Sequence, residues 1–230
     1  MAARTHLARI ERAIPSCTRC PELRAYCAEV ARAKRKAFES WEYWGRPVPG
    51  FGDAAASIWI VGLAPAAHGA NRTGRVFTGD RSGDFLYAAL HRAGLANQPT
   101  SVSRDDGLAL SGVYVSAALR CAPPANKPKP HELGNCSTYL DEEEHALRGW
   151  RVILALGSIA WGSALAMLER RGVAGFRPKP KFGHGARVAL DEGRSLIGCY
   201  HVSQQNTFTG VLTPAMIDEV LAQAKRFARG

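Results

Sequence analysis

The sequence predicts a single α/β domain, a sandwich of helices around a mostly parallel β-sheet. Short apolar runs alternate along the chain with segments that repeat apolar residues at helical spacing, and this alternation is typical of sheets covered by helices. The strand-like runs are apolar on both faces, as buried parallel strands are. A chain of 230 residues with 46% apolar composition can bury one substantial core, so we expect one domain over residues 1–230.

The strands are predicted from short apolar runs. They are expected at residues 57–63, 113–119, 152–156, 188–190 and 196–200. The helices are predicted from apolar periodicity and from capping residues. They are expected over 4–14, from Pro21 to about Lys36, from a cap at Ser82 or Asp84 to about Arg92, over 131–147 and 159–171, and from Thr213-Pro214 onward.

The uncharged run Val152–Leu168 approaches the length of a membrane span. Gly157-Ser158 interrupts it, so we interpret it as a buried strand, a turn with Ser158 as N-cap, and a helix. The N-terminus is charged and lacks the apolar stretch of a signal peptide. We therefore expect a cytoplasmic protein without membrane association.

The charge balance favours a polyanionic partner. Thirty Lys and Arg residues against twenty Asp and Glu give a formal charge of +10 and a pI near 9.6, which suits nucleic acid. A generally basic protein without such a partner is the alternative.

Two polar motifs follow predicted strands. Gly62-Leu63-Ala64-Pro65 comes after the strand at 57–63, and His201-Val202-Ser203-Gln204 comes after the strand at 196–200. Ligands of open α/β sheets bind beyond the carboxyl ends of the strands. We therefore expect both motifs to meet at one edge of the sheet.

Four of the six cysteines form two distant pairs, Cys17/Cys20 and Cys121/Cys136. Disulfides are not expected in a chain without an export signal. Structural zinc and an iron-sulfur cluster would both use four thiolates, and spacing alone does not separate them. Ordinary buried cysteines are a third interpretation, and it is the one we favour for Cys27 and Cys199.

The segments GLAPAAHGANRTGRVFTGD (62–80), YVSAALRCAPP (114–124) and HVSQQNTFTG (201–210), together with the cysteine pairs, resemble the B-type (fifth) family of uracil-DNA glycosylases. The resemblance covers the chain from Cys17 to the last helix. It implies a three-layer sandwich with a central four-stranded, mostly parallel sheet. It also implies a [4Fe-4S] cluster on Cys17, Cys20, Cys121 and Cys136, and this is our reason for preferring iron-sulfur to zinc.

The resemblance also implies a pocket for a base flipped out of DNA. Phe77 would stack on the base. The other predicted contacts to the base are Gly62, Leu63, Ala64, Asn126, Ser203 and Asn206.

His201 is expected to stabilise the negative charge on the departing base, and Asp80 to handle the attacking water, with His68 and Asn71 as further polar candidates. Asp80 could equally cap a helix. Other glycosylase families carry a polar residue where this chain has Ala64, and an asparagine where it has Ala117. We therefore expect a tolerant enzyme that accepts uracil, hypoxanthine and xanthine.

DNA would be contacted by the His201 loop and by basic residues. The predicted contacts are Gln205 as a polar wedge, Phe208, Arg72 and Arg75, with Lys127, Lys129, Lys179 and Lys181 as further phosphate contacts. The substrate would be double- or single-stranded DNA containing deaminated bases, bound by a monomer. No lysine lies in either motif, so we expect a monofunctional glycosylase without lyase activity. A metal-stapled nucleic-acid-binding module without chemistry is the alternative.

Overall fold

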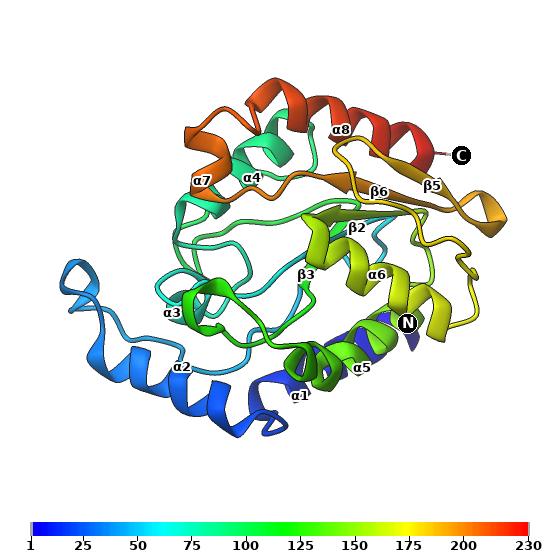
Figure 1. Cartoon of the computed structure of the whole chain (residues 1–230). Helices are drawn as coiled ribbons and strands as arrows, with labels where there is room; N and C mark the ends of the chain where they lie inside the picture. Colours follow the sequence, from blue (N-terminus) through cyan, green and yellow to red (C-terminus); the bar gives the residue numbers. More distant parts are fainter. Residues whose placement is uncertain (1, 230) are drawn as a thin grey trace.

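The computed structural model describes residues 2–229, which form one six-stranded sheet with helices on both faces (Figure 1). The strands are β1 (Phe51–Gly52), β2 (Ile58–Gly62), β3 (Val113–Ala117), β4 (Val152–Leu156), β5 (Arg187–Ala189) and β6 (Ser195–Cys199). Their order in the sheet is β1-β3-β2-β4-β6-β5. The α/β class and the sandwich are confirmed.

The strand number is a correction. The four central strands β3, β2, β4 and β6 pair in parallel, as expected. Two short antiparallel strands, β1 and β5, extend the sheet at its edges. β1 has two residues and β5 has three. Edge strands this short leave almost no periodic pattern, and β1 was not predicted for that reason.

The helices are α1 (Ala2–Ala13), α2 (Pro21–Ala33), α3 (Ala70–Thr73), α4 (Arg81–Arg92), α5 (Pro130–Ala146), α6 (Ser158–Arg170), α7 (Gln204–Phe208) and α8 (Pro214–Ala228). Alternate residues of the strands enter two separate cores. Trp59 and Ile153 pack with α1, α5 and α6, whereas Ile60 and Leu154 pack with α4 and α8. Each face of the sheet is therefore sealed by its own helix layer.

Local capping chemistry fixes where the helices begin. Asp80, rather than Ser82 or Asp84, caps α4, because its carboxylate accepts a hydrogen bond from the Gly83 backbone N–H at 3.0 Å. Gly157, with φ of +93°, replaces the expected Ser158 at the start of α6. The expected Thr213 cap of α8 is confirmed.

The uncharged run 152–168 divides into β4 and the first part of α6, as predicted. Within residues 2–229, no helix combines the length and apolar character that a membrane crossing requires.

The sheet brings the two polar motifs together. β2 and β6 both pair in parallel with β4, so their carboxyl ends lie on the same edge. Gly62 ends β2, and His201 follows β6 by two residues. The edge of the sheet therefore carries both motifs, one on each side of the end of β4, because β4 lies between β2 and β6.

Candidate active site

A cavity of about 530 Å³ lies at this edge of the sheet. It brings together eight of the residues predicted for the site, namely Leu63, Ala64, Phe77, Asp80, Asn126, His201, Ser203 and Gln205. These residues come from three distant parts of the sequence. Its size is within the range of small-molecule sites and is ample for one nucleobase.

Phe77 and His201 both line the cavity and lie close to each other. Their ring centroids are 6.5 Å apart, and the rings are inclined at 42°. Gly62 contributes by its lack of a side chain, because a Cβ there would lie 2.5 Å from Cζ of Phe77. Gly157 lies close to His201, because a Cβ on Gly157 would lie 3.2 Å from Cβ of His201. The two aromatic side chains are thus seated against the ends of β2 and β4.

The His201 imidazole is available to a ligand. Among the described residues, none forms a hydrogen bond to either of its ring nitrogens, and burial lowers its pKa from the ordinary value. The ring is therefore neutral near pH 7 and carries one N–H. Such a buried donor can bind an oxygen on which negative charge develops.

Asp80 serves two roles at once. Its carboxylate caps α4 and lines the cavity. Burial raises its pKa, opposed by hydrogen bonds from the Gly83 and Ser82 backbone and weakly by the charge of Arg72. The structural and catalytic interpretations are therefore compatible. A partly desolvated carboxylate of raised pKa is a suitable acceptor for a proton from water.

Backbone strain occurs at three residues of the cavity wall. Phe77 has φ of +49°, and Ala125 and Asn126 have φ of +53° and +56°. Positive φ is costly for residues other than glycine, and such residues cluster at binding sites. The turn at 125–126 presents Asn126 to the cavity, which agrees with its predicted contact to the base.

Ser203 and Asn206 form the start of the short helix α7. The Ser203 hydroxyl accepts from the Asn206 backbone N–H, and the Asn206 side-chain amide donates to the His201 carbonyl at 2.8 Å. Ser203 lines the cavity. The Asn206 amide N–H thus binds the His201 backbone, and Asn206 is not among the described residues that line the cavity, so its contact with the base stays a prediction.

Arg72 and Arg75 do not lie where the sequence predicted them. Each is only 3% exposed. Arg72 lies between the rings of Phe38 and Trp41 and donates to the Gly79 carbonyl. Arg75 pairs with Asp106 at 2.8 Å. Both guanidinium groups are engaged inside the protein, so the expected phosphate contacts by these two residues are corrected.

Two further predicted DNA contacts are accessible. Gln205 is exposed on α7, and Phe208, at the end of that helix, is 71% exposed.

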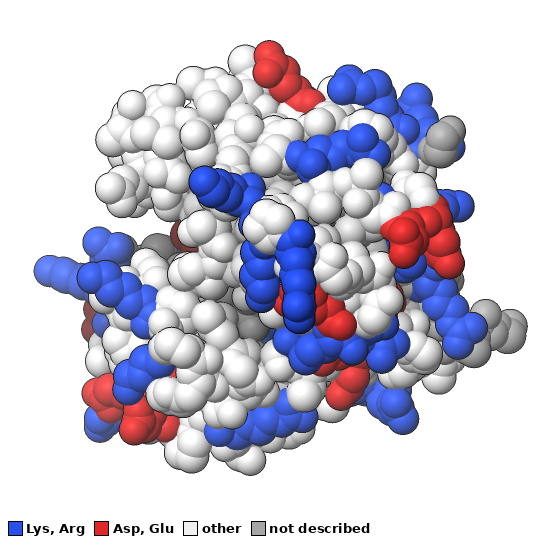
Figure 2. Space-filling view, turned by 45° about the vertical axis from the view of Figure 1, so that its right-hand side comes forward, with Lys and Arg blue, Asp and Glu red and all other residues white. Residues whose placement is uncertain are grey.

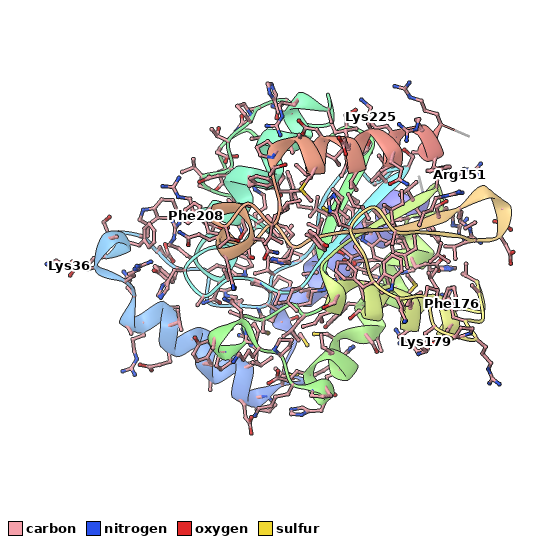
Figure 3. All side chains as sticks on the ribbon, turned by 45° about the horizontal axis from the view of Figure 1, so that its top comes forward. Lys36, Arg151, Phe176, Lys179, Phe208 and Lys225 are labelled. Atoms are coloured by element: carbon pink, nitrogen blue, oxygen red, sulfur yellow. The ribbon has the colours of Figure 1, made fainter. Side chains whose placement is uncertain are left out.

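Figure 3 shows Phe208 and Lys36 on the same side of the molecule. Figure 2 shows Lys and Arg covering more of one face than Asp and Glu. Phe208 is thus an exposed aromatic side chain on the same short helix as Gln205, which lines the cavity.

A second cavity, of about 870 Å³, adjoins the first and shares Asp80 and Asn126 with it. His68 lines it and forms a 3.1 Å hydrogen bond between Nδ1 and the Tyr43 hydroxyl. Trp41 lies on its wall. Tyr43 and Trp41 were not predicted for the site, and both lie in the aromatic segment FESWEYWG (38–45).

The four predicted ligand cysteines gather in one region. Cys17 and Cys20 precede α2, Cys121 follows β3, and Cys136 lies in α5. Cys121 and Cys136 belong to one core, and Cys17 and Cys20 pack against it. Burial raises the pKa of Cys136, and the neighbouring Cys20 and Cys17 raise it further. Yet among residues 2–229 no three His, Cys, Asp or Glu side chains converge enough to hold a single ion. The metal that these cysteines would hold therefore stays a prediction.

Comparison with known proteins agrees with this site. Residues 49–225 match the family described as the uracil DNA glycosylase superfamily. A protein of Mycobacterium tuberculosis named type-5 uracil-DNA glycosylase is 53% identical over 94% of this chain and 79% of its own length. Proteins of the same name from Thermus thermophilus and Pyrobaculum aerophilum are 52% and 47% identical, over 94% and 91% of this chain and 95% and 88% of their own lengths. The chain therefore belongs to the uracil-DNA glycosylase superfamily and to its type-5 family.

Proposed function

We propose that the protein excises uracil from DNA by hydrolysing the N-glycosidic bond. The observation that carries this function is the convergence of Phe77 and His201 on one cavity at the sheet edge. The flipped base stacks on Phe77, and its O2 lies toward His201. Relatives that align with almost the whole chain are named uracil-DNA glycosylases, and this supports the same activity.

The reaction breaks the bond between C1′ and the base nitrogen. The electron pair leaves with the base, and the negative charge spreads to O2, where the N–H of His201 binds it. A donor fixed in this way is worth on the order of a hundred- to a thousand-fold in rate. The sugar is left as an oxocarbenium-like centre at C1′.

Water completes the reaction. Its oxygen bonds to C1′, and its proton passes to the Asp80 carboxylate, which lies on the same cavity wall. The water attacks a centre that is already cationic, so a weak base suffices. The alanine at position 64 also lines the cavity and has no group to orient the water. Asp80 therefore carries this task, with His68 on the adjoining cavity.

Hypoxanthine and xanthine are further proposed substrates. Ala117 ends β3 and is 3% exposed, so no side chain at that position can pair with the edge of uracil. Sites that lack such a paired donor and acceptor reject other bases poorly. The adjoining 870 Å³ cavity gives room for the larger ring system of a purine.

Abasic-site cleavage is not part of the proposed activity. A lyase needs an amine that attacks C1′, and no lysine is among the described residues that line the cavity. The product is an intact strand with an abasic site.

DNA contact is proposed for α7. Gln205 lies at the cavity mouth, and Phe208 projects from the next turn. These residues would fill the space that the flipped nucleotide leaves in a duplex. Exposed lysines, rather than Arg72 and Arg75, supply the phosphate contacts. We propose that the enzyme acts as a monomer on double- or single-stranded DNA and works at the nucleoid.

A [4Fe-4S] cluster is the proposed cofactor, with Cys17, Cys20, Cys121 and Cys136 as ligands. The cluster would tie the segment before α2 to the loop after β3 and to α5. Its chemistry is structural, because the cavity with His201 and Asp80 needs no electron transfer. A brown preparation with absorbance near 400 nm is expected, whereas a colourless protein with stoichiometric zinc would overturn this proposal.

The function is tested with a duplex that carries a single uracil and with a matched duplex that carries cytosine. Alkali-labile sites should form at uracil alone, and untreated strands should stay intact. Duplexes with hypoxanthine and xanthine test the broader range. Absence of any abasic product with the iron-loaded protein would leave only the binding-module alternative.

A further inference from the structure

The turn that carries Phe77, at residues 76–79, lies between α3 and α4 and belongs to no helix or strand. Phe77 holds a φ of +49° in this turn, and this conformation is costly for any residue other than glycine. Such a residue persists only where the surrounding structure fixes it from several sides. The groups that hold the turn therefore decide where the Phe77 ring lies.

Buried hydrogen bonds fix the backbone on both sides of Phe77. The Tyr87 hydroxyl, from α4, donates to the Val76 carbonyl at 2.9 Å. The Gly79 backbone N–H donates to the Ser101 carbonyl at 2.9 Å. The turn is thus anchored to α4 before Phe77 and to the loop at 101–108 after it.

Thr78 connects these two anchors. It is fully buried, and its hydroxyl donates to the Val76 carbonyl at 3.1 Å. The same oxygen accepts from Nε of Arg75 at 2.9 Å and lies 2.7 Å from the Ser101 hydroxyl oxygen. One side-chain oxygen next to Phe77 therefore takes part in three hydrogen bonds.

Arg75 and Asp106 hold the loop at 101–108 against the turn. Nη2 of Arg75 donates to the Ser101 hydroxyl at 2.9 Å and to the Asp106 carboxylate at 2.8 Å. That carboxylate also accepts from the backbone N–H groups of Val102 at 2.8 Å and Leu108 at 3.0 Å. The side chains of Arg75 and Asp106 are 2% and 12% exposed. Water therefore competes little for these bonds, and the network is rigid.

The network lies behind the wall of the 530 Å³ cavity. Among the described residues that line this cavity, Phe77 is present, whereas Arg75, Thr78 and Asp106 are not. These three side chains can therefore reach a bound base only through the segments that they hold. Phe77 is the one residue of the turn at 76–79 that lines the cavity.

We propose that Arg75, Thr78 and Asp106 are positioning residues that hold Phe77 in the conformation that stacks on the flipped base. This inference rests on the proposed function, in which Phe77 is the stacking surface. The buried guanidinium of Arg75 thus serves the reaction by fixing the pocket wall.

Thr78→Val tests the proposal, because it removes the hydroxyl and nearly retains the shape of the side chain. Thr78→Ser restores the hydroxyl. Both changes are also made together with Phe77→Ala. Ser195→Ala is the matched control, because Ser195 is equally buried and its hydroxyl accepts from Nε of Arg187 at 3.0 Å, but it begins β6, at the end of the sheet away from the cavity. The measurement is single-turnover excision of uracil from a duplex at saturating enzyme, below the melting temperature of every variant.

Thr78→Val should lower the rate about ten- to a hundredfold, because small displacements in a site have effects of this size. Thr78→Ser should recover most of the rate, and Ser195→Ala should excise at the wild-type rate. In the Phe77→Ala background, Thr78→Val should have little further effect, because the ring that the network positions is already absent.

Thr78→Val protein with the wild-type rate would overturn the inference. An equal fall with and without the Phe77 ring would also overturn it, because the network would then act through Asp80 or through the fold as a whole. If Thr78→Val does not fold, Asp106→Asn, which removes the charge opposite Arg75, takes its place in the same comparison. Wild-type protein that excises no uracil, or Phe77→Ala protein that excises it at the wild-type rate, would instead overturn the proposed function, so the failures are distinguishable.

Discussion

The ring of Phe77 occupies the space that a side chain on Gly62 would need. A Cβ at Gly62 would lie 2.5 Å from Cζ and 2.7 Å from Cε2 of Phe77. Gly62 closes β2, and Phe77 holds a positive φ 15 residues later. The glycine and the strained phenylalanine therefore form one unit that sets the wall of the base pocket.

Gly62→Ala should impair catalysis by displacing the Phe77 ring. Real Cβ atoms essentially never approach so closely, so the ring must shift, and misplacement of about 1 Å in a site can cost about a hundredfold in rate. Single-turnover excision of uracil measures the effect. Gly162→Ala is the control, because a Cβ there meets nothing within 4 Å in α6. Equal rates for Gly62→Ala and the wild type would show that the ring position is irrelevant.

Asp80→Asn should lower activity while raising stability at neutral pH. The folded protein raises the pKa of Asp80 above its ordinary value of 3.8, mainly by burial. As the pH rises past 3.8, the unfolded chain loses this proton first, so ionisation favours unfolding. Asparagine removes that cost and still caps α4. Thermal melting at pH 7 should therefore occur at a higher temperature than for the wild type.

The gain should shrink as the pH falls and vanish below pH 3.8, where Asp80 is protonated in both the folded and the unfolded chain. Asp80→Ala separates the two roles, because it also removes the cap, at a cost of about 1 kcal/mol. Asp80→Asn protein that melts below the wild type at pH 7 would show that the carboxylate charge stabilises the fold, contrary to the expected sign.

Glu143→Gln should strongly destabilise the protein. Arg120 and Glu143 are 1% and 0% exposed in their side chains, and removing one partner leaves a buried charge unpaired. The expected loss is about 3 to 5 kcal/mol in the free energy of unfolding, measured by urea denaturation. Asp218→Asn, which breaks the exposed pair with Arg92, should cost less than about 1 kcal/mol. Equal losses in the free energy of unfolding for the two variants would show that the buried Arg120–Glu143 pair matters no more for stability than the exposed pair.

Phe208→Ala should affect duplex and single-stranded substrates differently. Phe208 is 71% exposed on α7, so its removal leaves the core intact. A side chain that fills the space of the flipped nucleotide matters only where a stack must be kept open. Excision from a duplex should fall several-fold, and excision from a single strand should change little. A similar fall for both substrates would assign Phe208 to general DNA binding.

The strands of the central sheet could be predicted from the sequence, because the apolar pattern that marks each strand lies within a few consecutive residues. Residues 152–156 are apolar on both faces, and β4 has these bounds. The convergence of the two motifs could also be predicted, because the carboxyl ends of parallel strands lie at the same edge of the sheet. The short strand β1 and the burial of Arg72 depend on tertiary contacts instead. Arg72 looks like a surface cation until Phe38 and Trp41, more than thirty residues earlier, are seen to enclose it.

The same limit applies to Asn206 and Cys27. Asn206 lies in the motif that resembles the family, yet its amide is engaged by the His201 carbonyl. Cys27 has no partner at metal-ligand spacing in the sequence, and only the packing of α2 against the loop after β3 brings it beside Cys121. The spacing of residues in a sequence predicts which of them are neighbours within one helix or strand. It does not predict contacts between different elements, such as that of Cys27 with the loop after β3.

His201 is tested most directly by single-turnover excision of uracil with the His201→Ala variant, at saturating enzyme and with matched iron content. The account predicts a fall on the order of a hundred- to a thousand-fold, with unchanged DNA affinity and melting temperature, because one fixed donor to the departing base is lost. A variant that excises uracil at the wild-type rate would contradict it.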